Sequence, residues 1–94
     1  MDINKALRTT VSTGKVYFGI REAKKAVKDG SAKLVIFSSN CPQKYIDDVF
    51  KSQKVATYNF KGTNTELGST CGKPFPISVL TVIKPGKSNI LQLK

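Results

Sequence analysis

Apolar residues recur at helical spacing in four separate stretches of the chain. In the first stretch, residues 2–14, Leu7 and Val11 lie one helical turn apart among polar neighbours. Asp2 is a suitable N-cap for this helix, and Gly14 can end it in a left-handed conformation. The pattern therefore predicts a helix that begins at the amino end of the sequence.

The other three helical stretches carry their own start and stop signals. They span residues 20–30, residues 42–53 and residues 63–69. Gly30 provides a stop for the first of them, and Pro42 occupies the tolerated first position of the second. Thr63 with Glu66 three residues later forms the capping-box pattern of the third.

Between these helices lie shorter apolar stretches of strand length, at residues 15–19, 32–39, 55–60 and 77–83. The second is continuously apolar, which is typical of a strand buried on both faces of a sheet. Residues 88–93 are expected to add a short edge piece. Strands that alternate with helices predict an α/β fold, a three-layer α/β/α sandwich with a mixed, mainly four-stranded sheet.

Composition limits the size and partners of this domain. The chain has 94 residues of which 39% are apolar, so we expect one domain over residues 1–94 with no large internal cavity. Sixteen basic residues against six acidic ones give a formal charge of +10, which favours a polyanionic partner, most commonly nucleic acid. The basic residues are dispersed, no stretch approaches membrane-spanning length and no secretory signal is present, so we expect no membrane partner and a cytoplasmic location.

The sequence offers little for metal or cysteine chemistry. Without histidine, Cys41 and Cys71 are too few for a zinc site or a disulfide scaffold, so both thiols are expected to be free and no cofactor is expected. Cys41 precedes a predicted helix, whose dipole can lower a thiol pKa. A buried or capping role is still favoured, because the chain has no histidine to serve as a base.

The segment "GSTCGK" resembles a phosphate-binding loop only superficially. Three residues rather than four separate Gly68 from Gly72, and Pro74 stands where such a loop needs Ser or Thr for magnesium. We interpret it as a turn between a helix and a strand.

Basic and polar residues gather instead at junctions of the alternating pattern. They are Gly14–Lys15, Gly19 with Arg21, Asn40, and Lys73 with Phe75, and we expect these junctions to meet at one end of the sheet. Arg and Asn read base edges, Lys neutralises phosphates, and an exposed aromatic ring stacks on an unpaired base. Pro74 and Pro76 stiffen the segment around Phe75, so its ring either packs into the core or is held out for a partner.

Several longer motifs resemble one protein family. The stretches "TGKVYFGIREAKKAVKDGSAKLVIFSSNCP" and "GTNTELGSTCGKPFPISVLTVIKPGKSNIL" are similar to the large-subunit ribosomal protein thirty of archaea and eukaryotes, a relative of the seven-Ae proteins. The resemblance covers nearly the whole chain. It implies a three-layer α/β/α sandwich that binds RNA kink-turns, which are bends built around tandem sheared G·A pairs.

The same resemblance implies a set of RNA-binding residues. The family's RNA-contacting positions correspond to Gly19, Arg21, Lys25, Asn40, Phe75 and Ile77, and the predicted interface also includes Lys73 and Pro76. Arg21 stands where the seven-Ae relatives carry asparagine, and Pro76 stands where the thirty family often has a basic residue.

These observations predict a non-enzymatic ribosomal protein of the large subunit that binds kink-turn ribosomal RNA. Lysines would supply most of the affinity, and Asn40 with Arg21 would select the G·A geometry. Other ribosomal proteins are further candidate partners, and a monomer is expected off the ribosome. Two alternatives stay open: a stand-alone kink-turn protein of a regulatory or guide ribonucleoprotein, and a redox or small-molecule enzyme that uses Cys41.

Overall fold

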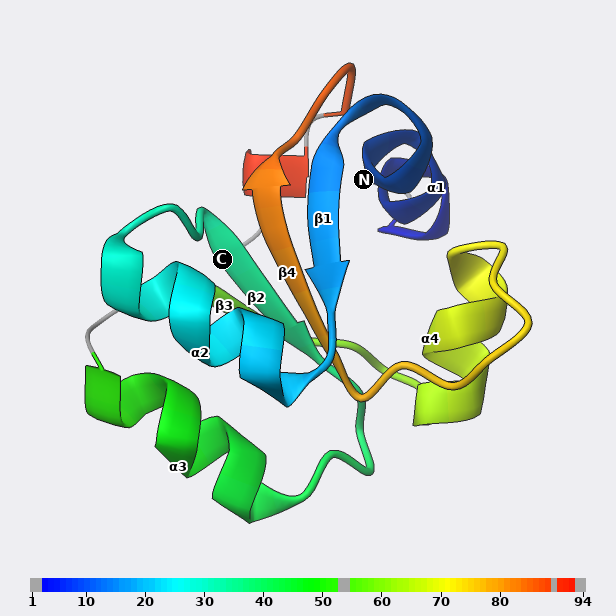
Figure 1. Ribbon diagram of the computed structural model, residues 1–94. Helices are drawn as coiled ribbons and strands as arrows, with labels where there is room; N and C mark the ends of the chain where they lie inside the picture. Colours follow the sequence, from blue (N-terminus) through cyan, green and yellow to red (C-terminus); the bar gives the residue numbers. More distant parts are fainter. Residues whose placement is uncertain (1–2, 53–54, 89, 93–94) are drawn as a thin grey trace.

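A four-stranded sheet lies between two pairs of helices in the computed structural model, which describes residues 3–52, 55–88 and 90–92 (Figure 1). The strands are β1 (Lys15–Phe18), β2 (Leu34–Phe37), β3 (Thr57–Asn59) and β4 (Val79–Lys84). Their order in the sheet is β1-β4-β2-β3. β4 is antiparallel to both of its neighbours, whereas β2 and β3 are parallel. The predicted fold class, with its mixed four-stranded sheet, is confirmed.

The helices agree closely with the stretches of helical spacing. They are α1 (Ile3–Thr13), α2 (Ile20–Asp29), α3 (Gln43–Ser52) and α4 (Asn64–Thr70), followed by a short 3-10 helix, η1 (Ile90–Gln92). Gly30 ends α2 with φ 82°, the left-handed conformation expected of it. The capping box is also present: the Glu66 N–H donates to Thr63 Oγ1 at 3.3 Å, and the Thr63 N–H donates to the Glu66 carboxylate at 3.1 Å.

Each face of the sheet has its own apolar core. α1, α4 and η1 pack on one face, around Leu7, Leu67 and Ile90. α2 and α3 pack on the other, around Val27 and Val49. All four residues of β2 are buried, so this strand is covered on both sides as its continuous apolar sequence predicted.

Two expectations about local structure are wrong. Gly14 is not among the glycines with positive φ; it is needed because a Cβ there would collide with the Lys84 carbonyl and crowd Gly86. Residues 90–92 form a 3-10 helix and not an edge strand, because Ile90 turns into the core beside α1 and is fully buried. The remainder of the expected edge piece includes residues 89 and 93, which lie outside the described residues, as does Asp2, the expected cap of α1.

The helices fall short of a membrane span. No helix in the described ranges is long and apolar enough to cross a bilayer.

Candidate nucleic-acid interface

Three connecting segments meet at one end of the sheet. Phe18 at the end of β1 lies opposite Leu80, and Phe37 at the end of β2 lies opposite Val79, the first residue of β4. The segments after β1, after β2 and before β4 are therefore neighbours; we call this the site end, at the bottom of Figure 1. It holds most of the predicted junctions.

One predicted junction lies elsewhere. Lys15 is paired with Lys84, the last residue of β4, at the opposite end of the sheet. The expectation that Gly14–Lys15 joins the other junctions is therefore wrong, because the antiparallel pairing of β1 with β4 places the start of β1 beside the end of β4.

Gly19 shapes the first of the three segments. Its backbone has φ 98° and ψ 162°, a region essentially restricted to glycine, and its N–H donates to the Val79 carbonyl at 2.9 Å. A Cβ at this position would have no atom within 4 Å, so the residue presents bare backbone at an open surface. Arg21 and Lys25, both exposed, follow on the first turns of α2. Without a capping side chain, the start of α2 offers N–H groups and a positive dipole end to an anion.

Asn40 lies in the second segment, and the protein itself holds its side chain. Its Oδ1 accepts hydrogen bonds from the Asn64 N–H at 2.8 Å and from Ser38 Oγ at 2.9 Å. Its Nδ2 donates to Asn64 Oδ1 at 3.1 Å. These contacts orient the amide while the residue stays exposed, so its second Nδ2 hydrogen can reach a ligand.

Phe75 is exposed, so of the two alternatives that the sequence left open for its ring, the structure shows the one in which the ring is held out. Its side chain is 44% exposed, and its ring meets Phe18 edge-to-face with 5.8 Å between centroids and 79° between planes. The Lys73 ammonium lies 5.6 Å from the centroid of the Phe18 ring. An aromatic pair with an adjacent cation suits a flat, electron-rich ligand that carries negative charge.

The backbone of this third segment is fixed against α4. The Lys73 N–H donates to the Gly68 carbonyl at 2.9 Å, and the Ile77 N–H donates to the Asn64 carbonyl at 2.9 Å. A Cβ at Gly68 would collide with the Phe75 carbonyl, so the absence of a side chain there lets the segment lie on the helix. Ile77 is only 2% exposed, which places its side chain in the core and not on the surface of the site end.

A hollow of about 340 Å³ separates the Phe75 segment from the start of α2. Gly19, Phe75 and Pro76 line it, together with two residues that the sequence did not single out, Phe18 and Tyr45. Phe18 directly precedes Gly19 in the sequence, so its position beside a predicted junction is the signal that could have identified it.

Asn64 is a third residue that the sequence did not single out, and it joins the second and third segments. It bonds Asn40 on one side, and on the other its Nδ2 donates to Ser78 Oγ at 3.4 Å. Only its place directly after the capping residue Thr63 hints at such a role in the sequence.

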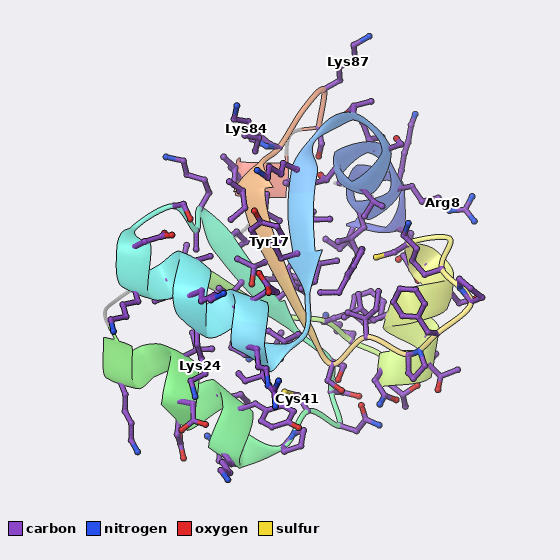
Figure 2. All side chains as sticks on the ribbon, viewed as in Figure 1. Arg8, Tyr17, Lys24, Cys41, Lys84 and Lys87 are labelled. Carbon is purple, nitrogen blue, oxygen red and sulfur yellow. The ribbon has the colours of Figure 1, made fainter. Side chains whose placement is uncertain are left out.

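The thiols are not activated. Burial raises the pKa of Cys41, which is labelled in Figure 2, above its usual value, whereas a helix dipole would lower it. Burial raises the pKa of Cys71 to about 11, although Lys73 acts in the other direction. Within the part of the chain that the structure describes, no three His, Cys, Asp or Glu residues cluster as metal ligands.

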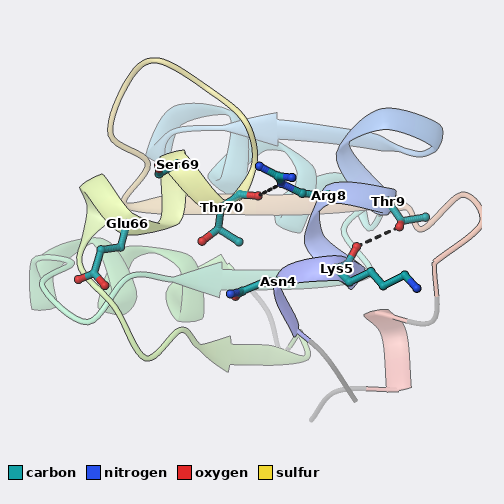
Figure 3. A pocket seen from close by; sticks show the side chains of 7 residues that line it. All are labelled: Asn4, Lys5, Arg8, Thr9, Glu66, Ser69 and Thr70. Carbon is teal, nitrogen blue, oxygen red and sulfur yellow. Dashed lines mark hydrogen bonds between the residues drawn. The ribbon is translucent and has the colours of Figure 1, made fainter.

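A larger hollow of about 620 Å³ lies away from the site end, between α1 and α4 (Figure 3). Arg8 crosses it, and its Nε donates to the Thr70 carbonyl at 3.2 Å. The guanidinium therefore caps the carboxyl end of α4. The residues that line this hollow thus hold α1 and α4 together.

Comparison with known proteins agrees with this architecture. The model of the family described as "Ribosomal protein L7Ae/L30e/S12e/Gadd45 family" matches residues 1–92. "Large ribosomal subunit protein eL30" of Methanocaldococcus jannaschii is 46% identical over 99% of this chain and 87% of its own length. The proteins of the same name from Methanococcus vannielii and Methanoregula boonei are 45% and 37% identical, over 99% and 100% of this chain and 91% and 97% of their own lengths. The chain thus belongs to the ribosomal protein L7Ae/L30e/S12e/Gadd45 family.

Proposed function

We propose that this chain is a ribosomal protein of the large subunit, and that its site end binds kink-turn ribosomal RNA. The observation that carries the proposal is the meeting of three unlike features at one end of the sheet. They are the bare backbone at Gly19, the fixed amide of Asn40 and the exposed ring of Phe75. Relatives that share 37–46% of their residues with this chain are named large ribosomal subunit proteins.

Each feature has a separate task in this proposal. The Asn40 amide and the Arg21 guanidinium donate to base edges of the sheared G·A pairs. Phe75 stacks on a base that the bend has turned out of the helix, and the hollow beside it accommodates that base. Lys25 and Lys73, with the start of α2, bind the phosphates on either side.

The chain has no catalytic role in this proposal. The site end presents donors, a ring and cations, and the two thiols have raised pKa values that keep them protonated at neutral pH. Ribosomal RNA is the partner, neighbouring ribosomal proteins are secondary partners, and the free protein is a monomer.

The test compares two RNAs that differ only at the bend. One carries tandem sheared G·A pairs, and in the other these are replaced by Watson–Crick pairs. The proposal expects the first RNA to bind at least about tenfold more tightly, since each lost pair of base contacts costs about 1–3 kcal/mol. Equal affinity for the two RNAs would show that only charge is recognised.

A second experiment separates the ribosome from a smaller ribonucleoprotein. The tagged chain is followed through a sucrose gradient of a cell extract, and the proposal expects it in the large-subunit fraction. If it sediments with small guide or regulatory particles instead, the kink-turn activity serves a different assembly.

A further inference from the structure

A second basic surface lies at the end of the sheet opposite the site end. Lys15 and Lys84 are paired across β1 and β4, and Lys33 leads into β2 beside them, where its N–H donates to the Val82 carbonyl at 2.8 Å. Lys87 follows on the turn after β4. Lys84 and Lys87 project outward at the top of Figure 2. We call these four exposed lysines the basic end.

The charges of the basic end are not neutralised within the described part of the chain. None of the four lysines forms an ion pair there; the described pair joins Lys24 to Asp48, on α2 and α3. Asp29 is the acidic residue closest to Lys33 in the sequence, and it accepts hydrogen bonds from Ser31 instead. Lys15 and Lys84 are partners next to a register irregularity between β1 and β4, so two like charges lie near each other, and a bound polyanion would offset their repulsion.

The backbone that carries these lysines is firmly held. The Lys87 N–H donates to Thr13 Oγ1 at 3.0 Å, which ties the turn after β4 to the end of α1. Gly86 has φ 64°, and a Cβ on it would collide with Thr13. The Lys15 ammonium lies 5.6 Å from the centroid of the Tyr17 ring. A preorganised backbone lowers the entropy cost of binding a partner.

The residue types at the basic end point to phosphates. Lysine is depleted in protein–protein interfaces, where aromatic residues and arginine are enriched. A membrane-binding surface needs several bulky apolar anchors beside its basic residues. Two large apolar side chains are exposed in the described chain: Phe75, at the site end, and Leu91 on η1, which lies near the end of β4 in Figure 1. A single leucine near the basic end does not provide such a group of anchors. Lysine point charges on a rigid edge are instead suited to the regularly spaced phosphates of an RNA helix.

We propose that the basic end binds the phosphate backbone of a second RNA segment, so that one chain joins two RNA segments through opposite ends of its sheet. β4 alone separates the two ends by roughly 17 Å, at about 3.3 Å per residue, so both RNA segments can be bound together. Recognition at the basic end depends on charge and shape rather than on sequence.

The experiment measures capture of an RNA duplex without a bend by the chain whose site end is already saturated with kink-turn RNA. The variant Lys84→Gln/Lys87→Gln is compared with Lys44→Gln/Lys51→Gln, a control that removes the same charge from exposed positions on α3. Thermal unfolding checks that both variants are folded.

The proposal expects the Lys84→Gln/Lys87→Gln variant to capture the duplex about tenfold more weakly at low salt. Its log–log salt slope should fall by about two, since each lost phosphate contact reduces the slope by about one. The α3 control should stay within about twofold of the unaltered chain. An equal loss in both variants would assign the effect to net charge and overturn the proposal, as would no capture by the unaltered chain.

Two further arms identify the partner of the basic end and its independence from the site end. A polyglutamate peptide that displaces the duplex at a lower concentration than unlabelled duplex does would identify a protein-binding surface and refute the RNA assignment. Phe75→Ala, immobilised through an amino-terminal tag and assayed without kink-turn RNA, should still capture the duplex. Failure of the kink-turn proposal is measured separately, by the comparison of bent and unbent RNA.

Discussion

Replacing Phe75 by alanine separates the two tasks of its ring. The ring is 44% exposed and meets Phe18 edge-to-face, so it contributes to folding and, in the proposed function, to stacking on a base. Truncation of a fully buried phenylalanine costs about 3–5 kcal/mol of unfolding free energy. Because nearly half of this ring is already in solvent, we expect Phe75→Ala to cost about 2 kcal/mol, including the ring pair.

This loss leaves the protein folded. A small domain loses about 4–8 °C of melting temperature per kcal/mol, which corresponds to a decrease of about 8–16 °C. The effect on RNA is independent of it, because base stacking is worth about 1–3 kcal/mol by alanine substitution. We therefore expect the dissociation constant for kink-turn RNA to rise about 5- to 150-fold, measured by fluorescence anisotropy well below the melting temperature.

Two further variants make the interpretation specific. Phe75→Leu keeps apolar volume without a flat ring, so it should recover most of the melting temperature but little of the affinity. Leu91→Ala truncates another exposed large apolar side chain among the described residues, 36% exposed on η1, and should leave RNA affinity unchanged. If folded Phe75→Ala binds RNA as tightly as the unaltered chain, or if Phe75→Leu binds normally, the stacking role is refuted.

Three more measurements test the neighbouring features. Binding of kink-turn RNA should weaken with salt at a log–log slope of several units, because several lysines release counterions, and a flat response would contradict this. Cys41→Ala/Cys71→Ala should bind RNA within about twofold of the unaltered chain; both thiols should react with iodoacetamide at pH 8 more slowly than free cysteine, because a raised pKa leaves less thiolate, and faster reaction would show an activated thiol. Gly68→Ala should lower both melting temperature and RNA affinity, because the new Cβ displaces the Phe75 carbonyl; unchanged affinity in a folded variant would show that the position of this segment does not matter.

Local patterns in the sequence were sufficient for most of the secondary structure. The capping box of Thr63 and Glu66 and the left-handed stop at Gly30 each depend on interactions within a few residues, so the sequence contains the whole signal. Local patterns did not predict the structure of residues 90–92. Their apolar character suits a strand, but burial of Ile90 beside α1 decides for a 3-10 helix.

The candidate site was predicted less completely, because its side chains are held by contacts distant in sequence. Asn40 depends on Asn64, 24 residues later, and Phe75 depends on Phe18 across the end of the sheet. Neither partner belongs to a motif. Gly68 was identified in a segment that we interpreted as a turn between a helix and a strand. Its role, the close approach of the Phe75 carbonyl, is visible only after α4 and β4 are placed.

The strand order explains why most of the predicted junctions meet at the site end and why Gly14–Lys15 does not. β4 lies between β1 and β2 and runs antiparallel to both, so its start must lie beside their ends, and its end beside their starts. The first consequence brings Gly19, Asn40 and Phe75 together at the site end. The second consequence places Lys15 at the opposite end of the sheet, where it is paired with Lys84. Spacing along the chain predicts that strands and helices alternate, but it does not predict which strands are neighbours. The order of the strands places Gly19, Asn40 and Phe75 at one end of the sheet and the paired Lys15 and Lys84 at the other.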